Sequence, residues 1–349
     1  MNKIGITTTV PIEILLAAGF KPVDLNNLFI TSPLPEKLIG IAEKDGFPLN
    51  CCSWIKGIYG ACVEFGIENI ICVTGGDCSN TIMLMEVLKQ KGLKTISFAY
   101  PDQPDIAKMT DLLENLACTL GTTVRESETI REELIPVRQK ALKLDRITWQ
   151  EGKISGWENH YWLVSASDFN QDISQYLSQV TELISDCRHR EPYPEDLLRI
   201  AYVGVPPIYG RDFYDFIETC GARVVFNETQ RQFAMLDTSN NLAEQYSNYT
   251  YPYSIVGRIR DIRNEIKRRK IDAVIHYMQA FCHRAIGDII FRHSLDLPIL
   301  TLEGNNEFTL SQQLQTRIEA FIDILKYKKK KLLILSGIDN TDKTEGGLI

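Results

Sequence analysis

The stretch IENIICVTGGDCSNTIMLMEVLKQKGLKTISFAY (67–100) decides the fold. It opens with a continuous apolar run, as strands buried inside a parallel sheet do. The glycine turn GGDCSN follows, and the amphipathic run TIMLMEVLKQKG then predicts a helix that stops at Gly92. KTISFAY (94–100) predicts the next strand. A strand, a helix and a second strand in this order form the unit of a parallel α/β sheet.

The same rhythm precedes this stretch and returns in the second half of the chain. Residues 4–10 predict a first strand, Pro11 suits the first turn of the next helix, and Gly19 suits its C-terminal cap. Further strands are predicted at LRIAYVGVPP (198–207), RVVFNE (223–228), IDAVIHYMQAF (271–281) and LPILTLEGN (297–305). Helices are predicted between them at DFYDFIETCGA (212–222), RIRDIRNEIKRRK (258–270) and RAIGDIIFRHS (284–294). We therefore predict an α/β fold with two similar parallel-sheet lobes.

The segment between the two lobes has a different character. Residues 104–197 are mostly helical in pattern, are richer in charge and contain three of the four tryptophans. The loop EPYPED (191–196) separates them from the next strand. We predict an N-terminal α/β lobe over residues 1–103, a helical connecting segment over 104–197 and a C-terminal α/β lobe over 198–349.

The composition excludes several classes of protein. The chain has 349 residues, of which 44% are hydrophobic, and its net charge is −7. A general nucleic-acid-binding protein would need a positive surface. No apolar run approaches the roughly 20 residues of a membrane-spanning helix. Pro11 and Glu13 interrupt the apolar N-terminal stretch, unlike a secretion signal. We expect a cytoplasmic protein with neither a nucleic acid nor a membrane as its partner.

Two nucleotide-binding motifs are missing from the sequence. It contains no GxxxxGK[ST], so we expect no ATP site of the P-loop type. It also contains no GxGxxG after the first strand, so a nicotinamide or flavin site is not indicated. The nine cysteines are too few for a disulfide scaffold and point instead to thiol, metal or redox chemistry.

Three cysteines stand apart from the rest. Most of the others are explained as small buried hydrophobic residues, but Cys52, Cys78 and Cys282 lie at predicted element ends beside polar residues. Cys78 and Cys282 occupy equivalent places, just past a buried strand and at the start of a helix, where open parallel sheets bind ligands. A shared metal site and three structural cysteines both remain open. No CxxC pair indicates a zinc site or a ferredoxin cluster.

Three thiolates would have a particular chemical meaning. A [4Fe–4S] cluster with three protein ligands leaves one iron open, and that iron can act as a Lewis acid as well as pass electrons. His283 would be a proton donor beside such a cluster, or a helix-terminal histidine that only packs on a loop. Glu303 ends a strand at the same edge, and Glu13 opens the first helix, where the helix dipole favours a carboxylate in any case.

Taken in order, six motifs resemble one known family. They are VPIEILLAAGF (10–20), LNCCSWIKGIYG (49–60), GGDCSN (75–80), QAFCHRA (279–285), LPILTLEGN (297–305) and QLQTRIEAFIDIL (313–325). Their order and spacing resemble the 2-hydroxyacyl-CoA dehydratase and benzoyl-CoA reductase family, and in particular the D-component subunits of 2-hydroxyglutaryl-CoA dehydratase. The resemblance extends from residue 4 to about residue 325.

The resemblance implies a fold, a cofactor and partners. It implies two flavodoxin-like lobes with a [4Fe–4S] cluster in the cleft between them, held by Cys52, Cys78 and Cys282, with Cys51 or Cys62 as alternates. It implies an acyl-CoA thioester as substrate and a separate ATP-hydrolysing iron–sulfur activator protein. It also implies a homodimer, or a heterodimer with a related subunit.

Three functions follow as hypotheses. The first is a radical-type 2-hydroxyacyl-CoA dehydratase, or a related acyl-CoA reductase. The second is a double-cubane-type reductase of small molecules, whose relatives carry a cysteine pair where this chain reads NYTYPYS (248–254) without any cysteine. The third is a non-catalytic, two-lobed binding protein. Iron content separates them, at about four, about eight and no irons per chain.

Overall fold

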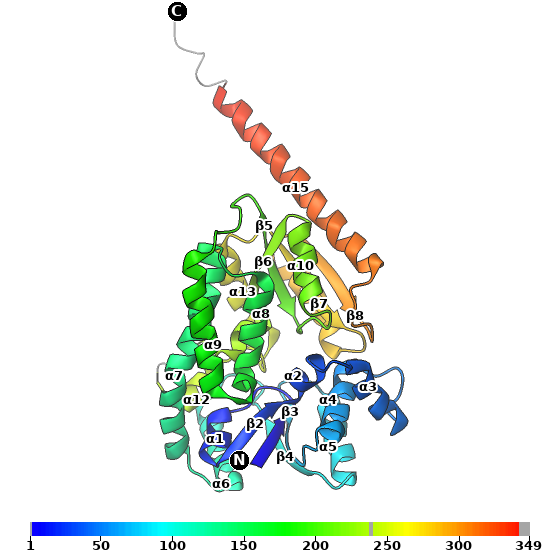
Figure 1. The fold of residues 1–349 in the computed structure, drawn as a ribbon, viewed down its shortest axis with the longest axis vertical. Helices are drawn as coiled ribbons and strands as arrows, with labels where there is room; N and C mark the ends of the chain where they lie inside the picture. The colour runs from blue at the N-terminus through cyan, green and yellow to red at the C-terminus, as the bar shows by residue number, and fades with distance from the viewer. Residues whose placement is uncertain (1, 237–239, 342–349) are drawn as a thin grey trace, which may run out of the picture.

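The computed structural model describes residues 2–236 and 240–341 of the chain. It contains two four-stranded parallel sheets, each surrounded by helices (Figure 1). The prediction of an α/β fold with two parallel-sheet lobes is therefore confirmed. The last residues of the predicted C-terminal lobe, 342–349, lie outside the described residues.

The first sheet has the strand order β2-β1-β3-β4. Its strands are β1 (Asn2–Ile6), β2 (Phe20–Asp24), β3 (Asn69–Gly75) and β4 (Lys94–Ala99). The sequence pattern did not predict β2, because Pro22 lies in the middle of it. Proline cannot donate a hydrogen bond within a ladder, but β2 is an edge strand and tolerates the loss.

The second sheet repeats this arrangement in the order β6-β5-β7-β8. Its strands are β5 (Leu198–Gly204), β6 (Ala222–Asn227), β7 (Ala273–Gln279) and β8 (Ile299–Gly304). In both sheets the third strand in the chain lies next to the first, so β7 is the equivalent of β3. Strand β7 is almost completely buried and the middle of β3 is buried, as their continuous apolar sequences predict.

The helices of the two lobes connect these strands. Those of the first lobe are α1 (Ile12–Ala17), α2 (Leu25–Ile30), α3 (Pro35–Lys44), α4 (Ser53–Glu64) and α5 (Asn80–Gln90). Those of the second are α10 (Arg211–Thr219), α11 (Glu228–Phe233), α12 (Leu242–Asn248), α13 (Ile255–Arg269), η5 (His283–Gly287), α14 (Asp288–Ser294) and α15 (Gln312–Thr341). Helix α15 extends away from the second sheet (Figure 1).

The segment between the sheets is helical and lies along one side of both lobes (Figure 1). Its longer elements are α6 (Ile106–Leu120), α7 (Val124–Arg146), η1 (Ile147–Glu151), α8 (Gly156–Val164) and α9 (Ile173–Asp186). Three short turns, η2 (Ser165–Ser167), η3 (Phe169–Gln171) and η4 (Cys187–His189), complete it. One apolar core joins Ile4 and Ile71 of the first sheet to Leu134, Val180 and Tyr246 on α7, α9 and α12.

Two buried ion pairs attach α7 to both lobes. Arg138 on α7 contacts Glu13 on α1 at 2.5 Å, and Arg269 on α13 contacts Asp145 on α7 at 2.6 Å. All four side chains are almost fully buried, so each charge depends on its partner. The helix therefore fixes the position of one sheet relative to the other. Within the described ranges, no helix has both the length and the apolar composition to cross a membrane.

Candidate active site between the two sheets

A mainly apolar-lined cavity lies where the carboxyl ends of strands from both sheets meet. It encloses about 880 Å³ and is open to solvent. Thr7, Asp24 and Cys78 border it at the ends of β1, β2 and β3, and Val205 and Cys282 border it after β5 and β7. Open parallel sheets bind their ligands at this edge. The cavity is therefore the candidate ligand-binding or active site of the molecule.

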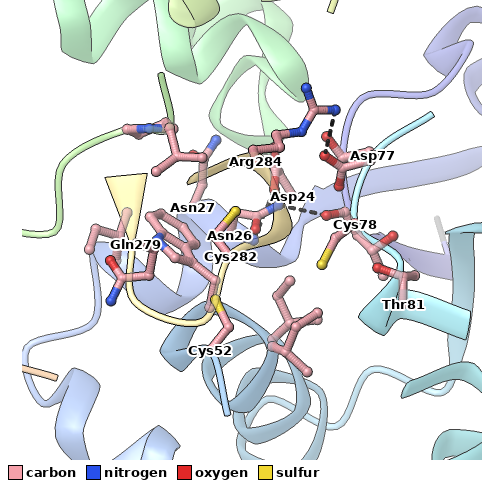
Figure 2. Close-up of a pocket in the computed structure, with 18 of the residues that line it drawn as sticks. Asp24, Asn26, Asn27, Cys52, Asp77, Cys78, Thr81, Gln279, Cys282 and Arg284 are labelled. Atoms are coloured by element: carbon pink, nitrogen blue, oxygen red, sulfur yellow. Dashed lines mark hydrogen bonds and ion pairs between the residues drawn. The ribbon is translucent and has the colours of Figure 1, made fainter. Parts of the chain in front are cut away.

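Three cysteine side chains from separate segments point into this cavity (Figure 2). Cys52 is the N-cap of α4, Cys78 lies two residues before α5, and Cys282 is the N-cap of η5. Cys78 and Cys282 follow β3 and β7, so the structure places them at equivalent positions of the two lobes. The fold brings together thiols that are up to 230 residues apart in the chain.

Backbone amides at the starts of these elements face the three sulfur atoms. The N–H groups of Trp54, Asn80 and Arg284 act to lower the pKa of Cys52, Cys78 and Cys282 respectively, against the larger effect of burial. Such donors stabilise a thiolate or a cluster sulfur ligand. Each thiol therefore has a neighbour suited to its ionised form.

Burial nevertheless keeps the thiols protonated when nothing is bound to them. It raises the pKa of Cys52 to about 11 and that of Cys78 to about 12, and it also raises the pKa of Cys282. The thiols add to this effect because each thiolate would repel the others: Cys282 raises the pKa of Cys52, and both raise that of Cys78. The three sulfur atoms therefore ionise together only if a positive group is bound between them.

Two hydrogen-bonded contacts join the lobes directly beside these cysteines. Next to Cys52, Gln279 Nε2 at the end of β7 donates to Ser53 Oγ at 2.8 Å. Next to Cys78, Arg284 Nη2 donates to the Gly76 carbonyl oxygen at 3.0 Å and lies 3.8 Å from the Asp77 carboxylate (Figure 2). The relative positions of the three thiols are thus set by contacts between the segments that carry them.

Gly76 is required by the turn that carries Cys78. Its φ is +93°, and a Cβ added there would lie 2.8 Å from the Pro252 carbonyl oxygen. A side chain would therefore meet both backbone strain and a clash with the second half of the chain. The glycine turn in GGDCSN allows the Cys78 segment to lie against the Pro252 segment.

Charged groups surround the cysteines on the side of the second sheet. Arg284 lies over the ring of Tyr251, with 4.4 Å from the guanidinium carbon to the ring centroid. Burial raises the pKa of Asp77, and Arg284 opposes that rise. Burial and then Arg284 lower the pKa of His283, so its imidazole is neutral near pH 7. A neutral imidazole beside the cavity can both accept and donate a proton.

A comparison with known families decides what this site belongs to. The sequence matches the family described as 2-hydroxyglutaryl-CoA dehydratase, D-component, over residues 7–325. The chain belongs to this family. It is thus a component of a dehydratase-type enzyme, and a D-component implies a partner subunit. Among curated proteins, no match to the chain is found.

The structure brings some of the predicted residues of this D-component family member together and leaves others apart. Cys52, Cys78, Cys282 and His283 all line the cavity. The remaining predicted residues, Glu13, Glu303, Cys51 and Cys62, do not line it.

The residues outside the cavity have other surroundings. Glu13 is fully buried, and Arg138 overcomes the effect of burial to hold the pKa of its carboxyl below the usual value. Glu303 is exposed on the edge strand β8. Cys62 is buried in α4 near Cys72, and burial raises the pKa of its thiol. Cys51 is half-buried beside Cys52.

The sequence analysis did not identify several residues that line the cavity. Asp24, Asn26 and Asn27 follow β2, the strand that the pattern did not predict. Gln279 and Arg284 lie on either side of Cys282 in the motif QAFCHRA, so their position in this motif could have indicated that they line the cavity. Within the described residues, no three His, Cys, Asp or Glu side chains are grouped as ligands of a metal ion.

Proposed function

We propose that this chain is the iron–sulfur subunit of an ATP-activated, radical-type 2-hydroxyacyl-CoA dehydratase or of a related acyl-CoA reductase. Its [4Fe–4S] cluster would be held by Cys52, Cys78 and Cys282, with one iron free of any cysteine. The observation that carries this proposal is the position of the three thiols, which line one cavity at the carboxyl ends of two parallel sheets. Membership of the D-component family supports it.

The donor set fits such a cluster in three respects. Thiolates are the ligands that iron–sulfur clusters take. A backbone N–H near each of the three sulfur atoms favours its ionised form, and such amides are the kind of neighbour that tunes a cluster. The ligands of a cluster bind different irons, so they need not be grouped around a single ion, and the described residues show no such group. Nine free cysteines are also typical of a reducing, cytoplasmic compartment.

The proposed reaction explains why such a group is needed. In a 2-hydroxyacyl-CoA the hydrogen to be removed is on the β-carbon and is not acidic, so acid–base elimination alone has no good route at neutral pH. When bound, a cluster with three cysteine ligands would supply an electron to the thioester and a Lewis-acid position for its carbonyl oxygen.

The chain's own residues would exclude water and handle protons. Trp54, Ile55, Ile58 and Val205 give the cavity an apolar wall, which favours a dry site once a substrate fills it. We propose that the neutral imidazole of His283 moves the proton, because it borders the same cavity as the three thiols. Glu13 is less suited, because it is engaged by Arg138, and Glu303 lies outside the lining.

The partners of the chain would bind beside the two equivalent cysteine segments. Ile82 and Met83 on α5 follow Cys78 and are exposed, and Phe281, Ile286 and Ile289 around Cys282 are exposed as well. Apolar side chains that gather beside a site mark a contact surface more often than scattered ones do. We propose that this surface takes the partner subunit, either a second copy or a related chain. ATP hydrolysis would belong to a separate activator protein.

The test of the reaction is anaerobic. Candidate 2-hydroxyacyl-CoA and aryl-CoA thioesters are added to the reduced protein, and the electron paramagnetic resonance spectrum of the cluster is followed. We expect at least one thioester to change the spectrum and to turn over when activator and ATP are added. The protein alone should hydrolyse no ATP. A spectrum that no thioester perturbs, together with no turnover, would refute acyl-CoA chemistry for this chain.

A further inference from the structure

A second hollow lies at the opposite end of the second sheet. It has about 1100 Å³ of space open to solvent. Arg199 and Arg223 line it at the starts of β5 and β6, together with the end of α13 and the η1 segment. The three-cysteine cavity lies beyond the other end of β5, and a parallel strand of this length spans roughly 20 Å. The hollow is therefore a separate place in the molecule.

Two arginines with unpaired charge lie side by side in this hollow. Arg199 donates from Nε to the Arg269 carbonyl oxygen at 2.6 Å and from Nη2 to the Trp149 carbonyl oxygen at 2.7 Å. Arg223 donates from Nη2 to the carbonyl oxygens of Thr148 and Ile154 at 2.6 and 3.1 Å. Within the described residues neither guanidinium forms an ion pair, and Nη1 of each has no hydrogen-bond partner. Both side chains are therefore held in place while some donors stay unused: Nη1 of Arg199, and both Nη1 and the buried Nε of Arg223.

The nearest carboxylates serve other groups. Asp272 accepts a hydrogen bond from the backbone N–H of Arg199, not from its side chain. Glu218 accepts one from the hydroxyl of Tyr193. Arg199 and Arg223 are paired positions of the neighbouring parallel strands β5 and β6, so their like charges repel each other. Burial and then Arg199 lower the pKa of Arg223 to about 10.

The other charged side chains around the hollow do not neutralise Arg199 and Arg223. Arg268 and Arg269 line it too, but both are paired with Glu265. Lys270 adds an exposed ammonium group at the end of α13. The carboxylates in the lining, Glu151 and Glu195, are both exposed and thus well solvated. The inner wall of the hollow therefore keeps an excess of positive charge.

A purely structural role accounts for only some of these donors. Arg199 Nε and the Nη2 groups of both arginines bind carbonyl oxygens near the ends of η1 and α13, a normal way to satisfy helix ends. That role does not require two guanidinium groups side by side without a carboxylate. That role also does not explain the space beside Arg223 Nη1. Residue 152 next to this nitrogen is a glycine, and a Cβ added there would lie 2.8 Å from Nη1. An anion between the arginines would relieve the repulsion and use the free donors.

We propose that this hollow binds the phosphate group of a small phosphorylated molecule on Arg199 and Arg223. A planar guanidinium fork matches phosphate oxygens well. The phosphate would come either from free inorganic phosphate or from a nucleotide. The rings of Trp149 and Tyr193 also line the hollow, and they already contact the guanidinium groups of Arg268, Arg269 and Arg223. The proposal goes beyond the proposed function and does not depend on it, because none of these residues lines the three-cysteine cavity.

The experiment is isothermal titration calorimetry of the full-length protein, which is purified without oxygen. Chloride keeps the ionic strength constant. Inorganic phosphate, AMP and coenzyme A are the three probes. We expect saturable binding of phosphate or AMP, which R199Q weakens by about tenfold or more. K267Q is the matched control, because Lys267 is an exposed cation on α13, the helix whose end lines the hollow, but does not itself line it. The K267Q variant should keep the affinity within about twofold of wild type.

The three probes distinguish free phosphate from a nucleotide as the ligand, and binding in this hollow from binding in the three-cysteine cavity. AMP binding more tightly than phosphate identifies a nucleotide, and equal binding identifies free phosphate. Coenzyme A binding that R199Q leaves unchanged belongs to the other cavity. K270N provides a second variant should R199Q not fold, because asparagine tolerates the positive φ of residue 270. The absence of saturable phosphate or AMP binding overturns the proposal, as does equal binding by wild type, R199Q and K270N.

Discussion

The two lobes share one topology but differ in the residues that they place around the cavity. In the first lobe the helix before the third strand has Cys52 as its N-cap, and Cys78 follows that strand. In the second lobe the corresponding N-cap is Ser254, and Cys282 follows the strand. Four equivalent positions thus carry three cysteines. The shared topology creates the four equivalent positions, and the one occupied by Ser254 has a hydroxyl in place of a thiol.

The serine shows how the fourth position is used instead. The Ser254 side chain accepts a hydrogen bond from the Val256 backbone N–H, as an ordinary helix cap does. Tyr251, three residues earlier, borders the cavity on this side. Ser254 itself does not line the cavity, so this position offers no fourth ligand there.

The largest effect is expected from removing one of the equivalent cysteines. Cys78→Ala and Cys282→Ala should each lose essentially all cluster iron, because two thiolates do not hold a cluster made for three. Cys187→Ala is the control, since Cys187 is buried on η4 outside the cavity. Iron analysis and visible absorption after anaerobic purification measure the result. Full iron occupancy in Cys282→Ala would contradict the ligand assignment.

The first helix of each lobe offers the next contrast. Glu13 on α1 is buried against Arg138, whereas Asp212 on α10 is exposed. Glu13→Gln should lower the free energy of unfolding by about 3–5 kcal/mol, because it leaves a buried guanidinium without a counter-charge. Asp212→Asn should change it by less than about 0.5 kcal/mol. Urea unfolding followed by circular dichroism gives both values, and a Glu13→Gln variant as stable as Asp212→Asn would mean that the ion pair is not structural.

The strands at the outer edges of the two sheets differ in a way that pH should reveal. Asp24 ends β2, and its backbone N–H donates to Asp168 Oδ2 at 2.8 Å, whereas Asn227 ends β6 and bonds Asn159. Burial and then Asp24 raise the pKa of Asp168 to about 7. Its protonated form therefore stabilises the fold below about pH 4, and this contribution is lost as the pH rises through 7.

Asp168→Asn should remove that part of the pH dependence. The variant is expected to gain stability over wild type at pH 8, by a few kcal/mol at most, and to vary less between pH 5 and 8. Asp172→Asn is the control, because Asp172 is also a helix N-cap but its side chain is exposed and lies outside the buried Asp24–Asp168 pair. Thermal unfolding across this pH range measures both. Parallel curves for wild type and Asp168→Asn would show that Asp168 is ionised throughout.

The smallest effect concerns the charges next to the equivalent cysteines. Burial raises the pKa of both thiols; Asp77 adds to this rise at Cys78, whereas Arg284 opposes it at Cys282. Arg284→Gln removes a buried positive charge beside the proposed cluster, so its reduction potential should become more negative. Arg292→Gln removes an exposed charge on α14 and should leave the potential unchanged. A redox titration gives both potentials, and an unchanged value for Arg284→Gln would show that Arg284 only joins the lobes.

Much of the fold was predictable because the central strands carry their own signal. The apolar runs of β3 and β7 predicted both strands, and their turns predicted the equivalent places of Cys78 and Cys282. The edge strand β2 was hidden by Pro22, since local preference cannot show that a strand has one free edge.

The contacts that complete the site were not predictable in this way. Arg284 with Gly76 and Gln279 with Ser53 join segments more than 200 residues apart. Nothing local in the sequence pairs them. The same holds for Glu13, whose helix-opening position was visible but whose partner Arg138 lies 125 residues away. Tertiary packing decides whether such a carboxylate faces a cavity or an arginine.

The most direct test of the central claim is the iron and acid-labile sulfide content of the wild-type protein purified without oxygen. Three thiols around one cavity predict about four irons and about four sulfides per chain, together with absorption near 400 nm. About eight irons per chain would indicate a second cubane and contradict a single cluster on Cys52, Cys78 and Cys282. Protein that stays free of iron, even after anaerobic reconstitution with iron and sulfide, would refute the account.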